Sequence, residues 1–270
     1  RLRGIIADMG GGEVKLKSVD KDFCLSFMEY LKTGYRTASG QPLKSKTVFN
    51  RQCTLITALN VAVREGIIPF NPMNRLSRHE RAKTNKGKRE FLTIDEVKTL
   101  IDAPCRREDI KSAFLFSCYC GLRISDVLAL KWKNVDCTGE QWHINIIMQK
   151  TQQPLYLPLS MQARKWMPER DGSGEEEAVF STLPCEDTCN VQIKQWVKEA
   201  GITKHVTYHV SRHTFATMLL TLGADLYTVS KLLGHSQIKN TQVYAEIINR
   251  RKVEAVNLAD NVFDTDDNLL

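Results

Sequence analysis

The 270-residue sequence predicts a mainly α-helical protein with one small antiparallel β-sheet, an α+β fold in two domains. Apolar residues recur at helical spacing over most of the chain, which favours helices. Strict alternation is confined to residues 142–158, which favours a single β-hairpin. A basic stretch, residues 76–90, has almost no apolar residues and separates two groups of helices. The length also exceeds the usual size of one compact domain.

The first group of helices is expected to form a small bundle over residues 18–75. Residues 1–17 are rich in glycine and are predicted to be an irregular N-terminal segment. Ser18 is suited to cap a helix that ends at Gly34, because its hydroxyl can accept a backbone N–H of the first turn. A second helix is predicted to start near Ser45.

Positive charge is concentrated in the first part of the chain. Residues 1–89 contain 18 Lys and Arg against 7 Asp and Glu, whereas residues 90–270 contain 20 against 24. This asymmetry indicates a polyanion-binding module joined to a near-neutral one, although a solvated basic surface gives the same composition. The basic linker, residues 76–90, is suited to bridge phosphates. The candidate phosphate-contacting residues are Lys44, Lys46, Arg51, Arg78, Arg81, Lys83, Lys86 and Lys88.

The second domain is predicted to open with a capping box, in which Thr93 and Glu96 satisfy each other's backbone N–H groups. Residues 109–120 have the composition of a buried helix, and Ser125 is suited to cap a short helix after it. Arg123 therefore lies at a sharp turn between two helices, where its side chain is free to leave the core.

The β region at residues 142–158 is expected to be a hairpin, because its alternation continues beyond a polar turn that carries Lys150. An acidic C-terminal tail is predicted at residues 259–270. The remaining helices are predicted at residues 188–200, 208–222, 225–233 and 241–257, within a domain that covers residues 91–258.

Composition excludes several classes of protein. No stretch of about 18 apolar residues is present, so no membrane span is expected, and no signal peptide is visible. None of the eight cysteines forms a Cys-x-x-Cys pair, which favours a reduced, cytosolic protein. Because the chain begins with Arg, we expect it to be a fragment that lacks an N-terminal segment.

His209 and Arg212 stand three residues apart on a predicted helix and therefore share a face. An imidazole beside a guanidinium suits an oxyanion, because Arg offers a fork of two donors. Taken alone, such a pair is more often a surface Arg and a core His. His213 adds a metal-binding alternative, but the zinc-protease pattern fails without its Glu and a nearby third ligand.

Taken one by one, the other candidate residues are weak evidence for a functional site, since each has an ordinary structural explanation. They are Arg123 followed by Asp126, Lys150 in a hairpin turn, His235 after a glycine, and Tyr244 at a helix start. Together with the His–Arg pair they form a set of cations around one phenol. Such a set suits stabilisation of a pentavalent phosphate while the phenol attacks it.

The order and context of these residues resemble the tyrosine recombinases, the phage integrase family. The segments that carry the resemblance are residues 120–132 (CGLRISDVLALKW), 209–217 (HVSRHTFAT) and 232–244 (LLGHSQIKNTQVY), with a fitting hairpin at 150–159 (KTQQPLYLPL). They are also similar to integrases of mobile elements from Bacteroides-type bacteria. The resemblance implies a helical, SAM-like core-binding domain and a catalytic domain that close around DNA as a C-shaped clamp. Nothing in the sequence resembles a further, arm-binding domain.

The resemblance assigns electrostatic roles to four residues. Arg123 and Arg212 would hold the two non-bridging oxygens of the scissile phosphate. His235 would donate a further hydrogen bond, and Asp126 would orient Arg123 or His209.

It assigns proton and bond-forming roles to three more. Tyr244 would be the nucleophile and form a 3′-phosphotyrosine, with His209 as the base. Lys150 would protonate the leaving 5′-oxygen as general acid. No cofactor, metal or ATP would be needed, because the cations supply the charge and the phosphotyrosine keeps the energy of the phosphodiester.

The resemblance further implies double-stranded DNA attachment sites as partners, a homotetramer on DNA, possible DNA-bending accessory proteins and a bacterial cytoplasmic location. The C-terminal segment would dock on a neighbouring subunit or on its own domain. The predicted function is site-specific recombination that integrates or excises a mobile element. The alternatives are a catalytically silent DNA-binding protein, a recombinase that resolves chromosome dimers, or a type IB topoisomerase relative.

Overall fold

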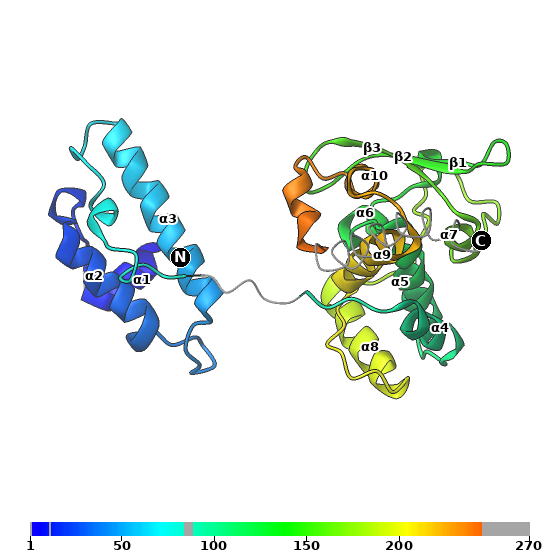
Figure 1. Ribbon diagram of the computed structural model, residues 1–270, viewed down its shortest axis with the longest axis horizontal. Helices are drawn as coiled ribbons and strands as arrows, with labels where there is room; N and C mark the ends of the chain where they lie inside the picture. The colour runs from blue at the N-terminus through cyan, green and yellow to red at the C-terminus, as the bar shows by residue number, and fades with distance from the viewer. Residues whose placement is uncertain (1, 11, 84–88, 245–270) are drawn as a thin grey trace, which may run out of the picture. The chain divides into compact units, whose positions relative to one another are not determined.

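The structure, a computed structural model, describes residues 2–10, 12–83 and 89–244. The chain divides into two compact units, unit 1 at Arg1–Lys88 and unit 2 at Arg89–Leu270. Each unit has its own hydrophobic core. Figure 1 shows that unit 1 is helical and that unit 2 combines helices with one small sheet. The predicted fold class is therefore confirmed.

Unit 1 is built from helices that bury their apolar faces against one another. Phe27, Leu31 and Met73 are fully buried at its centre. The second long helix starts at Ser45, as the sequence predicts. The elements are α1 (Leu2–Gly10), η1 (Leu16–Ser18), α2 (Lys21–Glu29), η2 (Tyr30–Gly34), α3 (Ser45–Arg64) and η3 (Pro72–Arg75).

Two sequence predictions for unit 1 are corrected. The segment predicted to be irregular, residues 1–17, contains helix α1, because Ile5 is buried in the core and its apolar neighbours pack on the same cluster. Ser18 does not cap α2. Asp20 does so instead, because its carboxylate accepts the backbone N–H of Phe23 at 2.8 Å.

Part of the predicted basic linker packs on unit 1. Arg81 donates from Nη2 to the carbonyl of Met73 at 2.9 Å, and the N–H of Ala82 donates to Oε1 of Gln52 at 2.7 Å. These contacts extend unit 1 beyond the predicted end of its bundle at residue 75. The linker residues 84–88 lie outside the described part of the chain.

Unit 2 opens with the predicted capping box of Thr93 and Glu96. Its first elements are α4 (Ile94–Asp102), α5 (Glu108–Cys120), α6 (Ile124–Leu128), η4 (Trp132–Asn134), β1 (Val135–Asp136), β2 (His143–Ile147), β3 (Pro154–Pro158) and α7 (Met161–Lys165). They are followed by α8 (Glu186–Glu199), α9 (Tyr208–Leu222), α10 (Leu226–Leu232), η5 (Ile238–Asn240) and η6 (Gln242–Tyr244).

Helices α5 and α9 form the centre of unit 2 and lie side by side (Figure 1). The rings of Phe114 on α5 and Tyr208 on α9 meet edge to face, with centroids 6.0 Å apart. The buried hydroxyl of Tyr208 donates to the carbonyl of Ala113 at 2.8 Å. This packing fixes α9, the helix that carries the His–Arg pair, against the core.

The three strands form an antiparallel sheet in the order β1-β2-β3, and the predicted hairpin is confirmed as β2 and β3. Ile144 lies opposite Leu157, and both are buried on the core face. Tyr156 lies on the other face and is 60% exposed. The sheet therefore has one buried face, and the turn after β2 holds Lys150 at its edge.

Further predictions are settled in unit 2. Arg123, not Ser125, is the residue that precedes α6, because the helix already begins at Ile124. The predicted helices at 188–200, 208–222 and 225–233 are confirmed as α8, α9 and α10. Of the last predicted helix, 241–257, the described residues hold only the short helix η6 (Gln242–Tyr244), and its remainder and the acidic tail lie outside the described residues. Within the described residues, no helix has the length and apolar character that crossing a membrane requires.

Candidate active site

Arg212 is the buried centre of the site. It lies on α9, is 3% exposed, and donates from Nη1 to the carbonyl of Gly121 at 2.7 Å and from Nη2 to the carbonyl of Leu233. Gly121 ends α5 with a φ of +74°, and Leu233 follows α10, so one guanidinium joins three helices. Burial, and then the charge of Arg123, lowers the pKa of Arg212 to about 9.

Arg123 extends from the turn between α5 and α6, as predicted. Its Nη1 lies 3.8 Å from Oδ2 of Asp126 and 3.5 Å from the sulfur of Met148. The buried Asp126 accepts the N–H of Gln149 on Oδ1 at 2.8 Å, and its Oδ2 has no hydrogen-bond partner among the described residues. Asp126 therefore links Arg123, rather than His209, to the hairpin turn that carries the lysine.

Lys150 occupies that turn and is exposed. The turn is closed by the N–H of Met148, which donates to the carbonyl of Gln153 at 2.9 Å, and by the N–H of Gln152, which donates to the carbonyl of Met148 at 2.8 Å. The charge of Lys150 is near enough to lower the pKa of His209. The structure thus brings Lys150 to the edge of the cationic cluster.

His209 and His213 stand one turn apart on α9, with their rings edge to face and centroids 4.7 Å apart. The His209 side chain is exposed. Partial desolvation, followed by the charges of Arg212 and Arg123, lowers its pKa from 6.5 to about 4. It is therefore neutral at pH 7.

His235 follows a glycine turn at the end of α10. Gly234 has a φ of +60°, and a Cβ there would lie 2.5 Å from the methyl carbon of Met148. The left-handed backbone at this position favours glycine, and a larger residue would also displace the end of the Met148 side chain. His235 Nδ1 is 2.8 Å from the hydroxyl of the buried Thr241, and burial followed by the charge of Arg212 lowers its pKa to about 4.

Tyr244 ends the described part of the chain in the short helix η6. It is 5% exposed, and its hydroxyl lies 2.5 Å from Nδ1 of His213. Burial raises the pKa of this phenol, and the charges of Arg89 and Arg212 partly oppose that rise. The phenol is therefore protonated at neutral pH and lies inside the cluster of cations and imidazoles.

Arg89 is a residue of this site that the sequence analysis did not select, because it was counted only as part of the basic stretch. The segment after it is anchored on unit 2, where the N–H of Leu92 donates to the buried hydroxyl of Thr214 at 3.0 Å. Nζ of Lys204 donates a hydrogen bond to the carbonyl of Phe91 at 2.9 Å. The charge of Arg89 lowers the pKa of the phenol and of all three imidazoles. Arg89 stands four residues before Thr93, at the end of the basic stretch, and its charge alone does not distinguish it from the other basic residues there.

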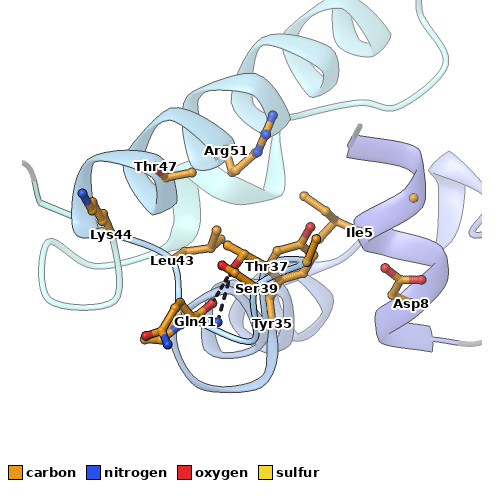
Figure 2. A pocket seen from close by; sticks show the side chains of 13 residues that line it. Ile5, Asp8, Tyr35, Thr37, Ser39, Gln41, Leu43, Lys44, Thr47 and Arg51 are labelled. Carbon is orange, nitrogen blue, oxygen red and sulfur yellow. Dashed lines mark hydrogen bonds between the residues drawn. The ribbon is translucent and has the colours of Figure 1, made fainter. Parts of the chain in front are cut away.

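The predicted phosphate-contacting residues of unit 1 have different environments. Lys44, Thr47 and Arg51 lie along α3 or at its start and line a cavity of about 840 Å³, which Figure 2 shows from close by. Arg81 is half-buried and donates to the carbonyl of Met73. Lys46, Arg78 and Lys83 are exposed, and Lys86 and Lys88 lie outside the described residues.

The chain is similar to known proteins over both of its units. Residues 90–250 match the phage integrase family, and residues 7–81 match the phage integrase SAM-like domain. Tyrosine recombinase XerC of Alcanivorax borkumensis is 29% identical over 222 residues, which is 77% of this chain and 71% of that protein. Tyrosine recombinase XerC of Serratia marcescens is 30% identical over 220 residues, 76% of this chain and 70% of that protein.

A solved structure shares the fold. The Tn1549 transposon integrase in complex with a circular intermediate DNA has a TM-score of 0.68 and 19% identity, covering 90% of this chain and 86% of that one. The chain belongs to the phage integrase family. It is an enzyme of site-specific DNA recombination, and this function is favoured over that of a silent DNA-binding protein.

Proposed function

We propose that the protein cleaves and rejoins DNA through a 3′-phosphotyrosine on Tyr244. The observation that carries this proposal is a buried phenol, Tyr244, whose hydroxyl is hydrogen-bonded to His213 and whose pKa, raised by burial, is partly lowered by the nearby charge of the buried Arg212. Groups that are desolvated and crowded by like charge gain most when an anion arrives. A phosphodiester is the anion that a nucleophilic phenol attacks.

Arg212 and Arg123 would bind the non-bridging oxygens of the scissile phosphate. A guanidinium has five N–H groups, and the carbonyls of Gly121 and Leu233 use two of those on Arg212. Three donors remain for the phosphate. Asp126 would hold Arg123, and His235, held by its contact to Thr241, would donate a further hydrogen bond.

A histidine of α9 would take the proton of the phenol, and the sequence assigns this role to His209. Lys150 would protonate the 5′-oxygen as it leaves. Its place on a solvent-exposed turn allows the side chain to reach a duplex that lies over the site. The reaction would need neither ATP nor a metal, because the phosphotyrosine retains the bond energy and the cations balance the charge.

The substrates would be two attachment sites on double-stranded DNA, held by units 1 and 2 as a clamp and joined within a homotetramer, with DNA-bending proteins as possible accessories. We infer that these sites are the ends of a mobile element, because the three motif segments resemble integrases of Bacteroides-type elements. Chromosome-dimer resolution is the alternative. Recombination of a pair of element ends, with no recombination at a chromosomal resolution site, would favour the mobile-element function over chromosome-dimer resolution.

The test is covalent trapping on nicked duplexes that carry candidate attachment sites. The wild type should form an adduct on the 3′ side in the presence of EDTA, whereas Tyr244→Phe should bind the same duplex and form none. Tyr156→Phe is a matched control, because Tyr156 is an exposed tyrosine of the same unit outside the site. An adduct in Tyr244→Phe, or none in the wild type on a duplex that it binds, would contradict the proposal.

A further inference from the structure

His213 lies at the centre of the site but has no role in the proposed reaction. It stands on α9 directly after Arg212 and one turn after His209. Of the three imidazoles, it is the one with a hydrogen bond to the hydroxyl of Tyr244, at 2.5 Å between Nδ1 and Oη. The rings of His213 and Tyr244 meet at 62° with centroids 5.8 Å apart.

Both partners of this contact are shielded from water. His213 is 9% exposed and Tyr244 is 5% exposed. The edge-to-face contact with His209 fixes the other side of the His213 ring. A buried hydrogen bond of this length, between two rings held by packing, places the oxygen of the phenol in one position.

The protonation states of both groups allow the phenol to donate this hydrogen bond. Burial, followed by His209, Arg89, Arg212 and His235, lowers the pKa of His213 to about 3. A neutral imidazole carries one donor and one acceptor nitrogen. The phenol is protonated, since burial raises its pKa. Nδ1 accepts the phenol O–H in the tautomer that carries the imidazole proton on Nε2, and this is the tautomer on which the proposal rests.

We propose that His213 is a further catalytic residue, which accepts the hydrogen bond of Tyr244 through Nδ1 and receives its proton during attack on the phosphate. This inference rests on the proposed function, and it moves the role of proton acceptor from His209 to His213. His209 is then free to contact the phosphate.

The step is balanced. The O–H bond of Tyr244 breaks and an N–H bond forms on His213, while the phenolic oxygen forms a bond to phosphorus. The bond from phosphorus to the 5′-oxygen breaks, and that oxygen takes a proton from Lys150. Bound phosphate makes the transfer easier, because an anion beside an imidazole favours its charged form. In religation the proton returns from His213 to Tyr244.

The first test needs no DNA, so its result is independent of the proposed function. In ¹⁵N-histidine NMR of the full chain at pH 7.5, Nδ1 of His213 should be an unprotonated, hydrogen-bonded nitrogen, with the proton on Nε2. The Tyr244→Phe variant should shift this Nδ1 resonance. A protonated Nδ1 in the wild type, or an Nδ1 resonance that Tyr244→Phe leaves unchanged, would overturn the proposal.

The second test measures the rate of adduct formation on the nicked duplex. His213→Asn keeps a polar group near the position of Nδ1 but cannot take up a proton. We expect the rate to fall about 100-fold at unchanged DNA affinity, the lower end of what a general base contributes. A wild-type rate would overturn the proposal. If His213→Asn fails to fold, the NMR comparison of wild type and Tyr244→Phe decides.

A duplex with a 5′-bridging phosphorothiolate distinguishes a defect in activating the nucleophile from a defect in protonating the leaving group. Sulfur leaves without a proton, so this duplex should restore the rate of Lys150→Ala. It should not restore the rate of His213→Asn, which acts on the nucleophile. Rescue of His213→Asn by sulfur would overturn the proposal, and a merely structural defect would lower DNA affinity as well.

Discussion

The two units of this protein hold their positive charge in opposite ways. Unit 1 carries predicted DNA contacts such as Lys44 and Lys46 on exposed side chains, whereas unit 2 buries Arg212 at 3% exposure. An exposed cation is solvated and screened by salt, so each one contributes little and many are needed. A buried cation has lost its hydration and gains strongly from an anion that replaces it. We therefore expect the exposed cations of unit 1 to serve DNA binding and the buried cation of unit 2 to serve catalysis.

The largest expected effect comes from a substitution that changes the shape of the buried cation but keeps its charge. Arg212→Lys keeps a positive charge but cannot donate to the carbonyls of Gly121 and Leu233 and to two phosphate oxygens together. We expect the rate of adduct formation to fall by about 10²–10³-fold, as when a preorganised donor is removed. Single-turnover trapping at saturating DNA measures it, with DNA affinity as the control. A rate within threefold of wild type would contradict the catalytic role of the buried cation.

The second effect is a pH dependence of the stability of unit 2 that begins below about pH 6.5. The unfolded chain takes up protons on His209, His213 and His235 below about pH 6.5, whereas the folded unit keeps them neutral down to a pKa of about 3 or 4. Because the unfolded state then binds more protons, stability is full above pH 6.5 and falls as the pH drops toward 4.

This effect is measurable because all four tryptophans, Trp132, Trp142, Trp166 and Trp196, belong to unit 2. Urea unfolding followed by tryptophan fluorescence should show a lower midpoint at pH 5 than at pH 7.5. The carboxylates of unit 2 with lowered pKa values titrate near pH 4 in the unfolded chain, so they contribute little between pH 7.5 and pH 5; they are Glu96, Asp109, Asp136, Glu176 and Asp225. Equal midpoints at the two pH values would refute the lowered pKa values of these three histidines.

The sequence predicted the members of the site because their types and order are informative. It located Arg123 at a helix turn and Lys150 in a hairpin turn, and the structure has both there. Local rules such as capping and alternation also predicted most elements, although α1 was missed because glycines flank its short apolar pattern.

The contacts of the site could not be predicted, because they join residues far apart in the chain. Arg212 bonds to carbonyls 91 and 21 residues away, and His213 meets a tyrosine 31 residues away. These pairings depend on how α5, α9 and α10 pack, which no local pattern encodes. Arg89 was missed for the same reason, since charge alone does not show whether a basic residue faces solvent or a phenol.

The smallest expected effect belongs to the exposed cations of unit 1. Lys44→Ala removes one charge next to the cavity beside α3, where Thr47 and Arg51 remain (Figure 2). If Lys44 contacts a phosphate, the slope of log affinity against log salt should become shallower by about 0.9, since one counterion fewer is released. The adduct rate at saturating DNA should stay unchanged, because no group of unit 2 is altered.

Lys32→Ala, an exposed lysine outside the predicted set, is the matched control and should leave the slope as it is. A reduced adduct rate at saturation would show that unit 1 contributes to chemistry as well as to binding, and the division between exposed and buried charge would fail.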